Sequence, residues 1–152
     1  MRIKIVIVAL MVLSSAMAFA AEENNLGLGV ILGNPTGITG KYFLDAESAI
    51  DAGAGWETSG DNRFHVYADY LYHINDLFDV GKGSLPLFFG VGLRFISIED
   101  DDDELGIRLP VGLEYVFPKL PIRLFGELVP VLDLTPDTEF SLDGGVGIRY
   151  FF

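Results

Sequence analysis

Apolar residues occupy every second position along most of the chain. In the last segment, VGIRYFF, the side chains of Val146, Ile148 and Tyr150 alternate with Gly147 and Arg149. A strand with this period of two has one apolar face and one small or charged face. Turn residues and polar loops separate such segments, so the pattern predicts an all-β chain of eight strands. The expected strands span residues 26–33, 37–44, 48–56, 63–73, 85–96, 105–117, 122–132 and 140–152.

One proline conflicts with this pattern. Pro110 lies inside the sixth expected strand, and a proline cannot donate a hydrogen bond to a neighbouring strand. A closed barrel has no free edge on which such a residue could lie. Pro110 therefore argues against this strand or for a local bulge, and we retain the strand at 105–117 as the expectation.

The amino terminus has the features of a secretory signal. Arg2 and Lys4 precede nine apolar residues at 5–13, and Ala18 and Ala20 form a small-residue cleavage site. A membrane-anchoring helix needs about 20 apolar residues, which is more than this segment offers. We expect residues 1–20 to be a cleaved signal peptide and residues 21–152 to form one domain. Cleavage removes two of the ten basic residues, so the formal net charge changes from −12 to −14.

The composition narrows the class of protein. Hydrophobic residues make up 50% of the chain, yet residues 21–152 contain no apolar run long enough for a membrane helix. The lack of cysteine excludes a disulfide-stabilised scaffold, and the strong negative charge disfavours nucleic-acid binding. Two classes remain. One is a soluble lipocalin-like barrel with an apolar core, and the other is a membrane barrel with its apolar face outward.

The charges on the second face favour the membrane barrel. They are of both signs and nearly balanced, whereas the excess of negative charge lies in turns and loops. Such a set can pair inside a narrow lumen, where side chains fill the space enclosed by eight strands. Glycines on the same face would leave room for arginines. The expected lumen network is Arg63, Asp69, Arg94, Arg108, Glu114, Arg123, Glu127, Asp143 and Arg149, with Lys41 and Asp51 on the same face.

We hypothesise that the four arginines at 94, 108, 123 and 149 pair with the acidic members of this network, which would plug the lumen. Aromatic residues on the apolar face lie towards strand ends, as in the girdles that membrane barrels carry at both interfaces. The expected girdle is Tyr42, Trp56, Tyr70, Tyr72, Phe95 and Tyr115.

These features resemble the small eight-stranded outer-membrane barrels of OmpA/OmpX type over nearly all of residues 21–152. The ending Ile148-x-Tyr150-x-Phe152 is similar to the carboxy-terminal signal that the barrel assembly machinery reads in that class. The stretch GNPTGITGK at 33–41 also resembles the first hairpin of bacterial barrel families of this size. The resemblance implies location in the bacterial outer membrane, with membrane lipids and the assembly machinery as partners. It implies no cofactor, and we expect a monomer.

Candidate chemistry is sparse. His65 and His73 are the only histidines, and a lipid hydrolase would need one of them beside a residue such as Ser59. The acidic run at 99–104 could bind a hard cation, but its spacing is not that of an EF-hand, and such runs usually form solvated loops. We therefore expect a non-enzymatic integral outer-membrane barrel with a structural or surface-interaction role. A lipid-modifying or small-ligand-binding barrel is the alternative, and a narrow channel is a third reading.

Overall fold

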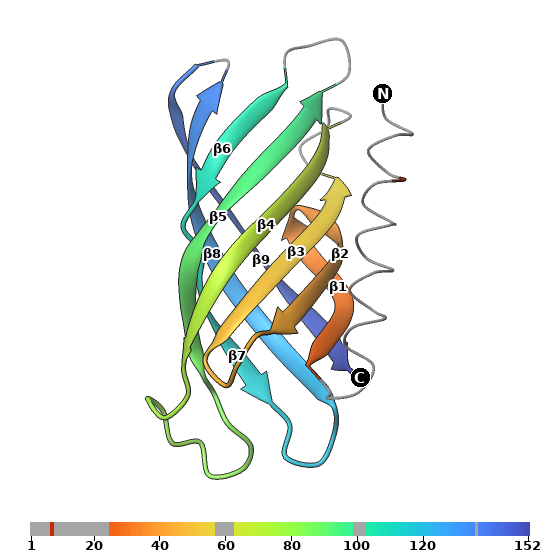
Figure 1. Ribbon diagram of the computed structural model, residues 1–152, viewed down its shortest axis with the longest axis vertical. Helices are drawn as coiled ribbons and strands as arrows, with labels where there is room; N and C mark the ends of the chain where they lie inside the picture. The colour runs from red at the N-terminus through yellow and green to blue at the C-terminus, as the bar shows by residue number, and fades with distance from the viewer. Residues whose placement is uncertain (1–6, 8–24, 57–62, 99–102, 136) are drawn as a thin grey trace.

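The computed structural model describes residue 7 and residues 25–56, 63–98, 103–135 and 137–152, and their strands form one antiparallel sheet. The sheet curls into a tall barrel with inclined strands (Figure 1). Its strands are β1 (Leu26–Asn34), β2 (Thr36–Phe43), β3 (Ser48–Trp56), β4 (Arg63–Ile74), β5 (Leu87–Ile98), β6 (Glu104–Arg108), β7 (Val111–Val116), β8 (Ile122–Thr135) and β9 (Glu139–Phe151).

The sheet closes on itself. Each strand from β1 to β5 pairs with the next, β1 also pairs with β9, and β9 pairs with β8. Both β6 and β7 lie between β5 and β8, so together they occupy one strand position of the ring, and we call each such position a wall. The described residues therefore form nine strands in an eight-walled barrel, which confirms the predicted all-β antiparallel barrel.

The main difference from the prediction concerns the sixth strand. It is not continuous, because β6 ends at Arg108 and β7 begins at Val111, with Leu109 and Pro110 between them. The wall persists through other backbone contacts: Leu109 N donates to Pro130 O at 2.9 Å, and Gly90 N donates to Pro110 O at 3.0 Å. The pairing of β6 with β8 shifts register between Leu105 and Gly106, where it skips Leu134 of β8. The missing N–H of Pro110 explains the break.

The other strand boundaries agree with the prediction to within three residues, and the largest differences are in β8 and β5. Strand β8 continues to Thr135, so residues 133–135, which the sequence assigned to a loop, belong to the wall. Strand β5 begins at Leu87, not at residue 85, and Ser84 makes an isolated bridge to Val116. The first of these differences matters for the lumen, because it turns Asp133 inward.

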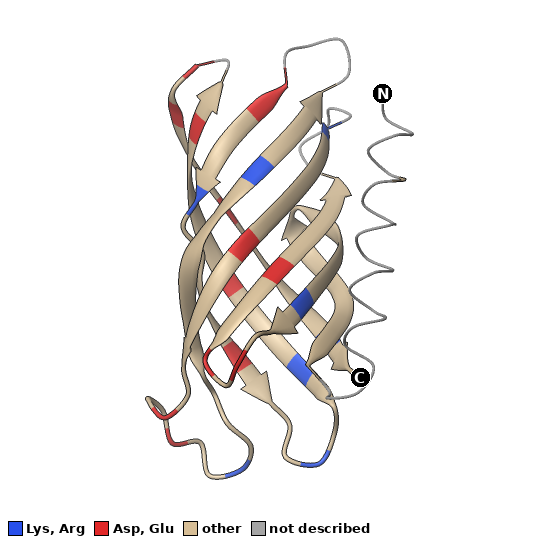
Figure 2. Ribbon diagram, in the orientation of Figure 1, with Lys and Arg blue, Asp and Glu red and all other residues tan. Residues whose placement is uncertain are grey.

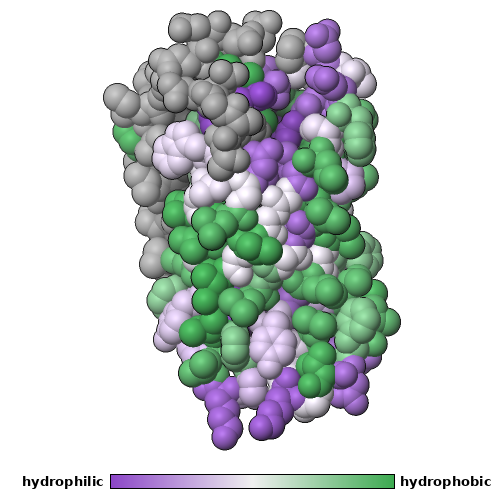
Figure 3. Space-filling model, turned by 180° about the vertical axis from the view of Figure 1, so that it is seen from behind, coloured by the Kyte–Doolittle hydropathy of each residue, from purple (hydrophilic) through white to green (hydrophobic). Residues whose placement is uncertain are grey.

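The two faces of the wall differ in polarity. Large apolar side chains such as Leu32, Leu93, Leu128 and Val146 are exposed on the outside. The space-filling view shows a hydrophobic surface over the middle of the barrel and hydrophilic residues at its lower end (Figure 3). Charged residues lie along the strands as well as in the connections (Figure 2). No helix within the described ranges is long and apolar enough to cross a membrane.

We call the end where β1 begins and β9 finishes the terminal end, and the opposite end the far end. The connections 44–47, 75–86 and 117–121 lie at the terminal end. The tight β1–β2 turn at Pro35, the last residues of β3, β5 and β8 and the first residues of β4, β6 and β9 lie towards the far end. The predicted signal peptide falls on residues of which only Ile7 is described, so it remains a prediction.

Candidate functional site: the charged lumen

Among the described residues, ten charged side chains are buried inside the barrel. They come from seven of its eight walls, because alternate positions on each strand point to the same enclosed space. Four are basic and six are acidic, so the buried charges nearly balance. They are Lys41, Asp51, Asp69, Arg94, Arg108, Glu114, Glu127, Asp133, Asp143 and Arg149. Arg123 and Arg63 extend this set towards the two ends, with partly exposed side chains.

Glu114 is the centre of the charged network in the terminal half of the lumen. Its carboxylate accepts hydrogen bonds from Lys41 Nζ at 2.7 Å and from Arg123 Nη1 at 2.7 Å. Arg149 Nη1 lies 3.9 Å from the same carboxylate. Three cations from β2, β8 and β9 thus converge on one acidic residue of β7, whose side chain is fully buried. Charge-assisted hydrogen bonds of this kind are stronger than neutral ones.

Two carboxylates face each other in the middle of the lumen. Asp51 of β3 and Asp69 of β4 are direct cross-strand neighbours, an arrangement that is unfavourable for like charges. A cation approaches each of them. Arg108 Nε donates to Asp69 at 3.0 Å, and Arg149 Nη2 donates to Asp51 at 3.2 Å. Arg108 also lies 3.7 Å from Glu127. The arginines therefore offset the repulsion between the two strands.

Arg94 holds the far half together. Its guanidinium donates to Asp143 at 2.6 Å, to Asp133 at 2.7 Å and to Ser141 at 3.1 Å. Asn34 at the β1–β2 turn donates to the other oxygen of Asp143 at 3.1 Å. This cluster links β5, β8, β9 and the end of β1 across the lumen.

Four of the cations lie on aromatic rings, and each ring covers a glycine of the adjacent strand. Tyr67 is the direct cross-strand partner of Gly53, and the Arg108 guanidinium lies 3.9 Å from the Tyr67 ring centroid. A Cβ added to Gly53 would lie 2.5 Å from the Tyr67 ring. The glycine therefore lets the ring lie flat against the wall, with its face turned to the cation.

The same arrangement occurs three more times. In each, the glycine and the ring are direct cross-strand partners, and the cation lies within 5 Å of the ring centroid. The sets of glycine, ring and cation are Gly27, Phe151 and Arg123 at 4.6 Å; Gly112, Phe88 and Lys41 at 4.9 Å; and Gly147, Phe125 and Arg149 at 4.0 Å. Together with Ile31 and Leu71, the rings of Phe88 and Phe125 form an apolar cluster within the lumen.

The structure brings eight of the nine expected network residues into the lumen clusters. The ninth, Arg63, forms a rim pair with Glu104 at 2.7 Å, and both side chains are partly exposed. The expected network lacks Asp133, because the turn-forming residues at 133–139 predict a loop. The alternation of outward Leu132 and Leu134 around Asp133 was the signal that could have identified it.

The expected girdle residues lie on the outer face. Trp56, Tyr70 and Tyr72 are exposed, and Tyr42, Phe95 and Tyr115 are half-buried. The expected assembly signal also faces outward, since Ile148, Tyr150 and Phe152 are all exposed at the terminal end. Membrane anchoring and recognition by the assembly machinery remain predictions for these positions.

The histidines lie in structural surroundings. His73 contacts the carbonyl oxygen of Glu47 through Nδ1 at 2.9 Å and packs between Phe43 and Phe88. His65 is buried, with Nε2 4.0 Å from Asp143. Ser59 and residues 99–102 of the acidic run lie outside the described residues, so a hydrolase arrangement there and a cation site are untested. Among the residues that are described, no group of three or more His, Cys, Asp or Glu could hold a metal ion.

Comparison with known proteins supports the fold. No protein-family model matches the sequence, and a search of curated proteins gives no match. Among solved structures, the barrel is similar to the N-terminal β-barrel domain of OprF from Pseudomonas aeruginosa, with a TM-score of 0.58 and 18% sequence identity. The similarity covers 84% of this chain and 94% of the OprF domain. The chain therefore has the fold of the small outer-membrane β-barrels of OmpA type.

Proposed function

We propose that the protein is a non-enzymatic integral barrel of the bacterial outer membrane, with a structural or surface-interaction role and a lumen closed by its charged network. The observation that carries this proposal is the polarity of the wall. Apolar side chains cover the outside, whereas ten charged side chains are buried inside. This is the reverse of a soluble barrel and fits a wall that is solvated by lipid.

The closed lumen is supported by the geometry of the ion pairs. Glu114, Arg108 and Arg149 are fully or almost fully buried, and each contacts partners from at least two other strands. The rings of Phe88, Phe125 and Tyr67 fill space between them. Side chains thus occupy the interior of an eight-walled barrel, as its narrow diameter predicts.

The fold and the proposed location also suggest partners and an oligomeric state for the protein. Outer-membrane lipids would surround the barrel, and the barrel assembly machinery would insert it, with Ile148, Tyr150 and Phe152 as the recognised ending. We expect a monomer without a bound cofactor.

Two measurements test the proposal. The protein should fractionate with outer membranes and resist carbonate extraction, whereas recovery as a soluble periplasmic protein would contradict the membrane location. In planar bilayers the purified protein should give little or no steady conductance. A reproducible large conductance whose ion selectivity changes in Glu114→Gln would show that the lumen is an open channel.

A further inference from the structure

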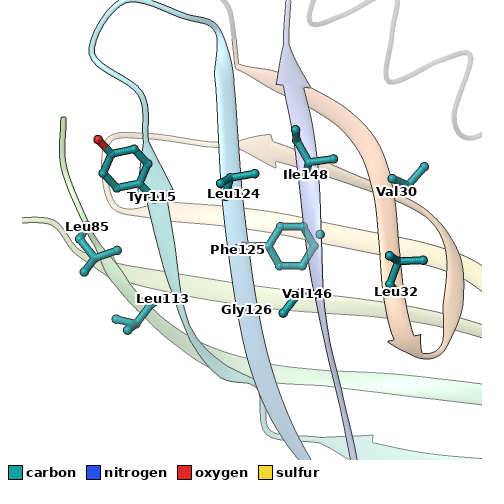
Figure 4. A pocket seen from close by; sticks show the side chains of 11 residues that line it. Val30, Leu32, Leu85, Leu113, Tyr115, Leu124, Phe125, Gly126, Val146 and Ile148 are labelled. Atoms are coloured by element: carbon teal, nitrogen blue, oxygen red, sulfur yellow. The ribbon is translucent and has the colours of Figure 1, made fainter. Parts of the chain in front are cut away.

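An apolar groove crosses the outside of the barrel. Its volume is about 540 Å³, and it runs over the outer faces of β7, β8, β9 and β1 (Figure 4). Outward side chains form its walls, while Gly126 of β8 lies at its centre. A Cβ on Gly126 would meet only the Val146 side chain, at 3.6 Å, so the missing side chain leaves open space. The principal wall residues are Val30, Leu113, Tyr115, Leu124, Val146 and Ile148.

The groove is continuous with the terminal end of the barrel. Tyr115 lines it, and the Tyr115 hydroxyl donates to the carbonyl oxygen of Lys82 at 3.1 Å. Ser84 and Val116 exchange two backbone hydrogen bonds, of 3.2 and 2.8 Å. These contacts hold the connection that carries Lys82 against the end of β7. Lys119 lies in the connection that follows β7.

The distribution of basic residues gives this end a distinct chemistry. Between residues 21 and 152 there are eight lysines and arginines. Six of them belong to the lumen or its rim. The other two, Lys82 and Lys119, are exposed and lie in the two connections that adjoin β7. Within the described part of the chain, neither lysine lies within 4.0 Å of a carboxylate. Figure 2 shows both connections at the lower end of the barrel.

We propose that this groove binds one acyl chain of an anionic glycerophospholipid, whose phosphate pairs with Lys82 and Lys119. An apolar groove that leads to two cations matches a molecule with a hydrocarbon tail and an anionic head. Four neighbouring strands at about 4.8 Å spacing give the groove a length that suits most of an acyl chain. The proposal rests on the membrane location proposed above, because such a lipid is available there.

The opposite wall provides a matched control. Ala52 faces outward on β3, between Gly40 of β2 and Ala68 of β4, so this wall also presents small residues to the outside. In the ring, β3 lies opposite β8. A leucine at Ala52 adds the same kind of apolar bulk as a leucine at Gly126, but outside the groove.

Native mass spectrometry of the folded protein, released from detergent, tests the proposal. Phosphatidylglycerol and phosphatidylcholine with identical acyl chains are offered together. The wild type should retain one phosphatidylglycerol in preference to phosphatidylcholine. Gly126→Leu should lower retention of both lipids about tenfold, because it fills the groove. Lys82→Gln with Lys119→Gln should lower phosphatidylglycerol retention about fivefold, to the level of phosphatidylcholine. Ala52→Leu should bind like the wild type.

Several results would overturn the assignment. The first is equal retention of the two lipids by the wild type, and the second is unchanged retention by Gly126→Leu. The third is a wild-type dimer that Gly126→Leu abolishes, which would mean that a second copy of the chain occupies the groove. If Gly126→Leu does not fold, the double lysine variant decides, because its changes lie in exposed connections. If the protein inserts into vesicles but retains no lipid, only the lipid-binding proposal is contradicted. If the protein stays soluble, the proposed function is contradicted as well.

Discussion

The two halves of the lumen hold their cations in different ways. In the terminal half and the middle, Lys41, Arg108, Arg123 and Arg149 lie on aromatic rings as well as beside carboxylates. In the far half, Arg94 is held by oxygen atoms alone: two carboxylates and the Ser141 hydroxyl. Within the described residues, no aromatic ring lies over Arg94.

This difference has consequences for how each half tolerates change. A ring and a carboxylate together surround a cation from two sides, with little room for water. The three oxygen acceptors around Arg94 are partly redundant, since the loss of one leaves two. The terminal half should therefore depend on every partner, whereas the far half should absorb the loss of one. Substitutions in the two halves should therefore differ in their cost to stability.

Loss of the Glu114 charge should be the most damaging change. In Glu114→Gln, the cations Lys41, Arg123 and Arg149 would lose the carboxylate on which they converge. Breaking a buried ion pair on one side costs about 3–5 kcal/mol. The free energy of unfolding, measured by urea titration in lipid vesicles, should fall by an amount of this order.

A second variant controls for simple loss of packing. Adding Lys41→Met to Glu114→Gln removes one of the stranded cations and retains an unbranched side chain. The double variant should recover part of the lost free energy. If Glu114→Gln alone unfolds at the same urea concentration as the wild type, the terminal half does not depend on this carboxylate.

Disruption of the contact between Gly53 and the Tyr67 ring should have the next largest effect on stability. In Gly53→Ala, the new methyl group would lie 2.5 Å from the Tyr67 ring and push it from its place under Arg108. Overpacking of this kind costs about 1–3 kcal/mol, which the same urea titration would measure. Gly126→Ala is the matched control, because its methyl group meets only Val146, and it should be close to neutral.

The ring itself can be tested by a double-mutant cycle. With Tyr67→Val in place, Gly53→Ala should cost less than it does in the wild type, because the ring that it displaces is gone. Equal costs in the two backgrounds would mean that the ring does not depend on the glycine.

Part of the fold and of the lumen network could be predicted from the sequence. Alternation of apolar and polar residues predicted the strands and both faces of the wall, because side chains on a strand can point only to two sides. Pro110 marked the irregular wall for the same reason that it breaks the wall: it has no N–H to donate. These features depend on residues within a single strand.

The contacts across the lumen could not be predicted in the same way. Arg149 reaches Asp51 and Thr39, which are 98 and 110 positions away, and this choice depends on the registers of every intervening strand. The inward glycines were expected to make room for arginines, but the structure shows rings lying over four of them. At Gly92 a Cβ would overlap Asp69 and the backbone of β4, so this inward glycine leaves no room for any side chain.

A smaller effect is expected in the far half. Asp143→Asn leaves Arg94 with Asp133 and Ser141, and the asparagine oxygen can still accept a hydrogen bond. The free energy of unfolding should fall by about 1 kcal/mol, clearly less than for Glu114→Gln. Equal losses for the two variants would remove the distinction between the halves. Asp133→Asn is the control for redundancy, and we expect it to behave like Asp143→Asn.

The smallest expected effect lies outside the lumen, in the β2–β3 turn at the terminal end. The Asp45 carboxylate accepts hydrogen bonds from the backbone N–H groups of Glu47 at 2.8 Å and Ser48 at 2.7 Å. These bonds hold the pKa of Asp45 below its usual value of 3.8. A carboxylate with a lowered pKa stabilises the folded state above its unfolded pKa, and this contribution is lost as the pH falls through the folded pKa.

Comparison of the wild type with Asp45→Asn isolates this charge, because asparagine can still accept both bonds. The wild type should unfold at a slightly higher urea concentration from pH 7 down to about pH 5, and the difference should shrink below about pH 4, where Asp45 becomes protonated. Asp76→Asn, in the neighbouring exposed connection, is the control for the loss of one surface carboxylate. A difference that persists unchanged at pH 3 would mean that the turn is stabilised by the shape of the side chain and not by its charge.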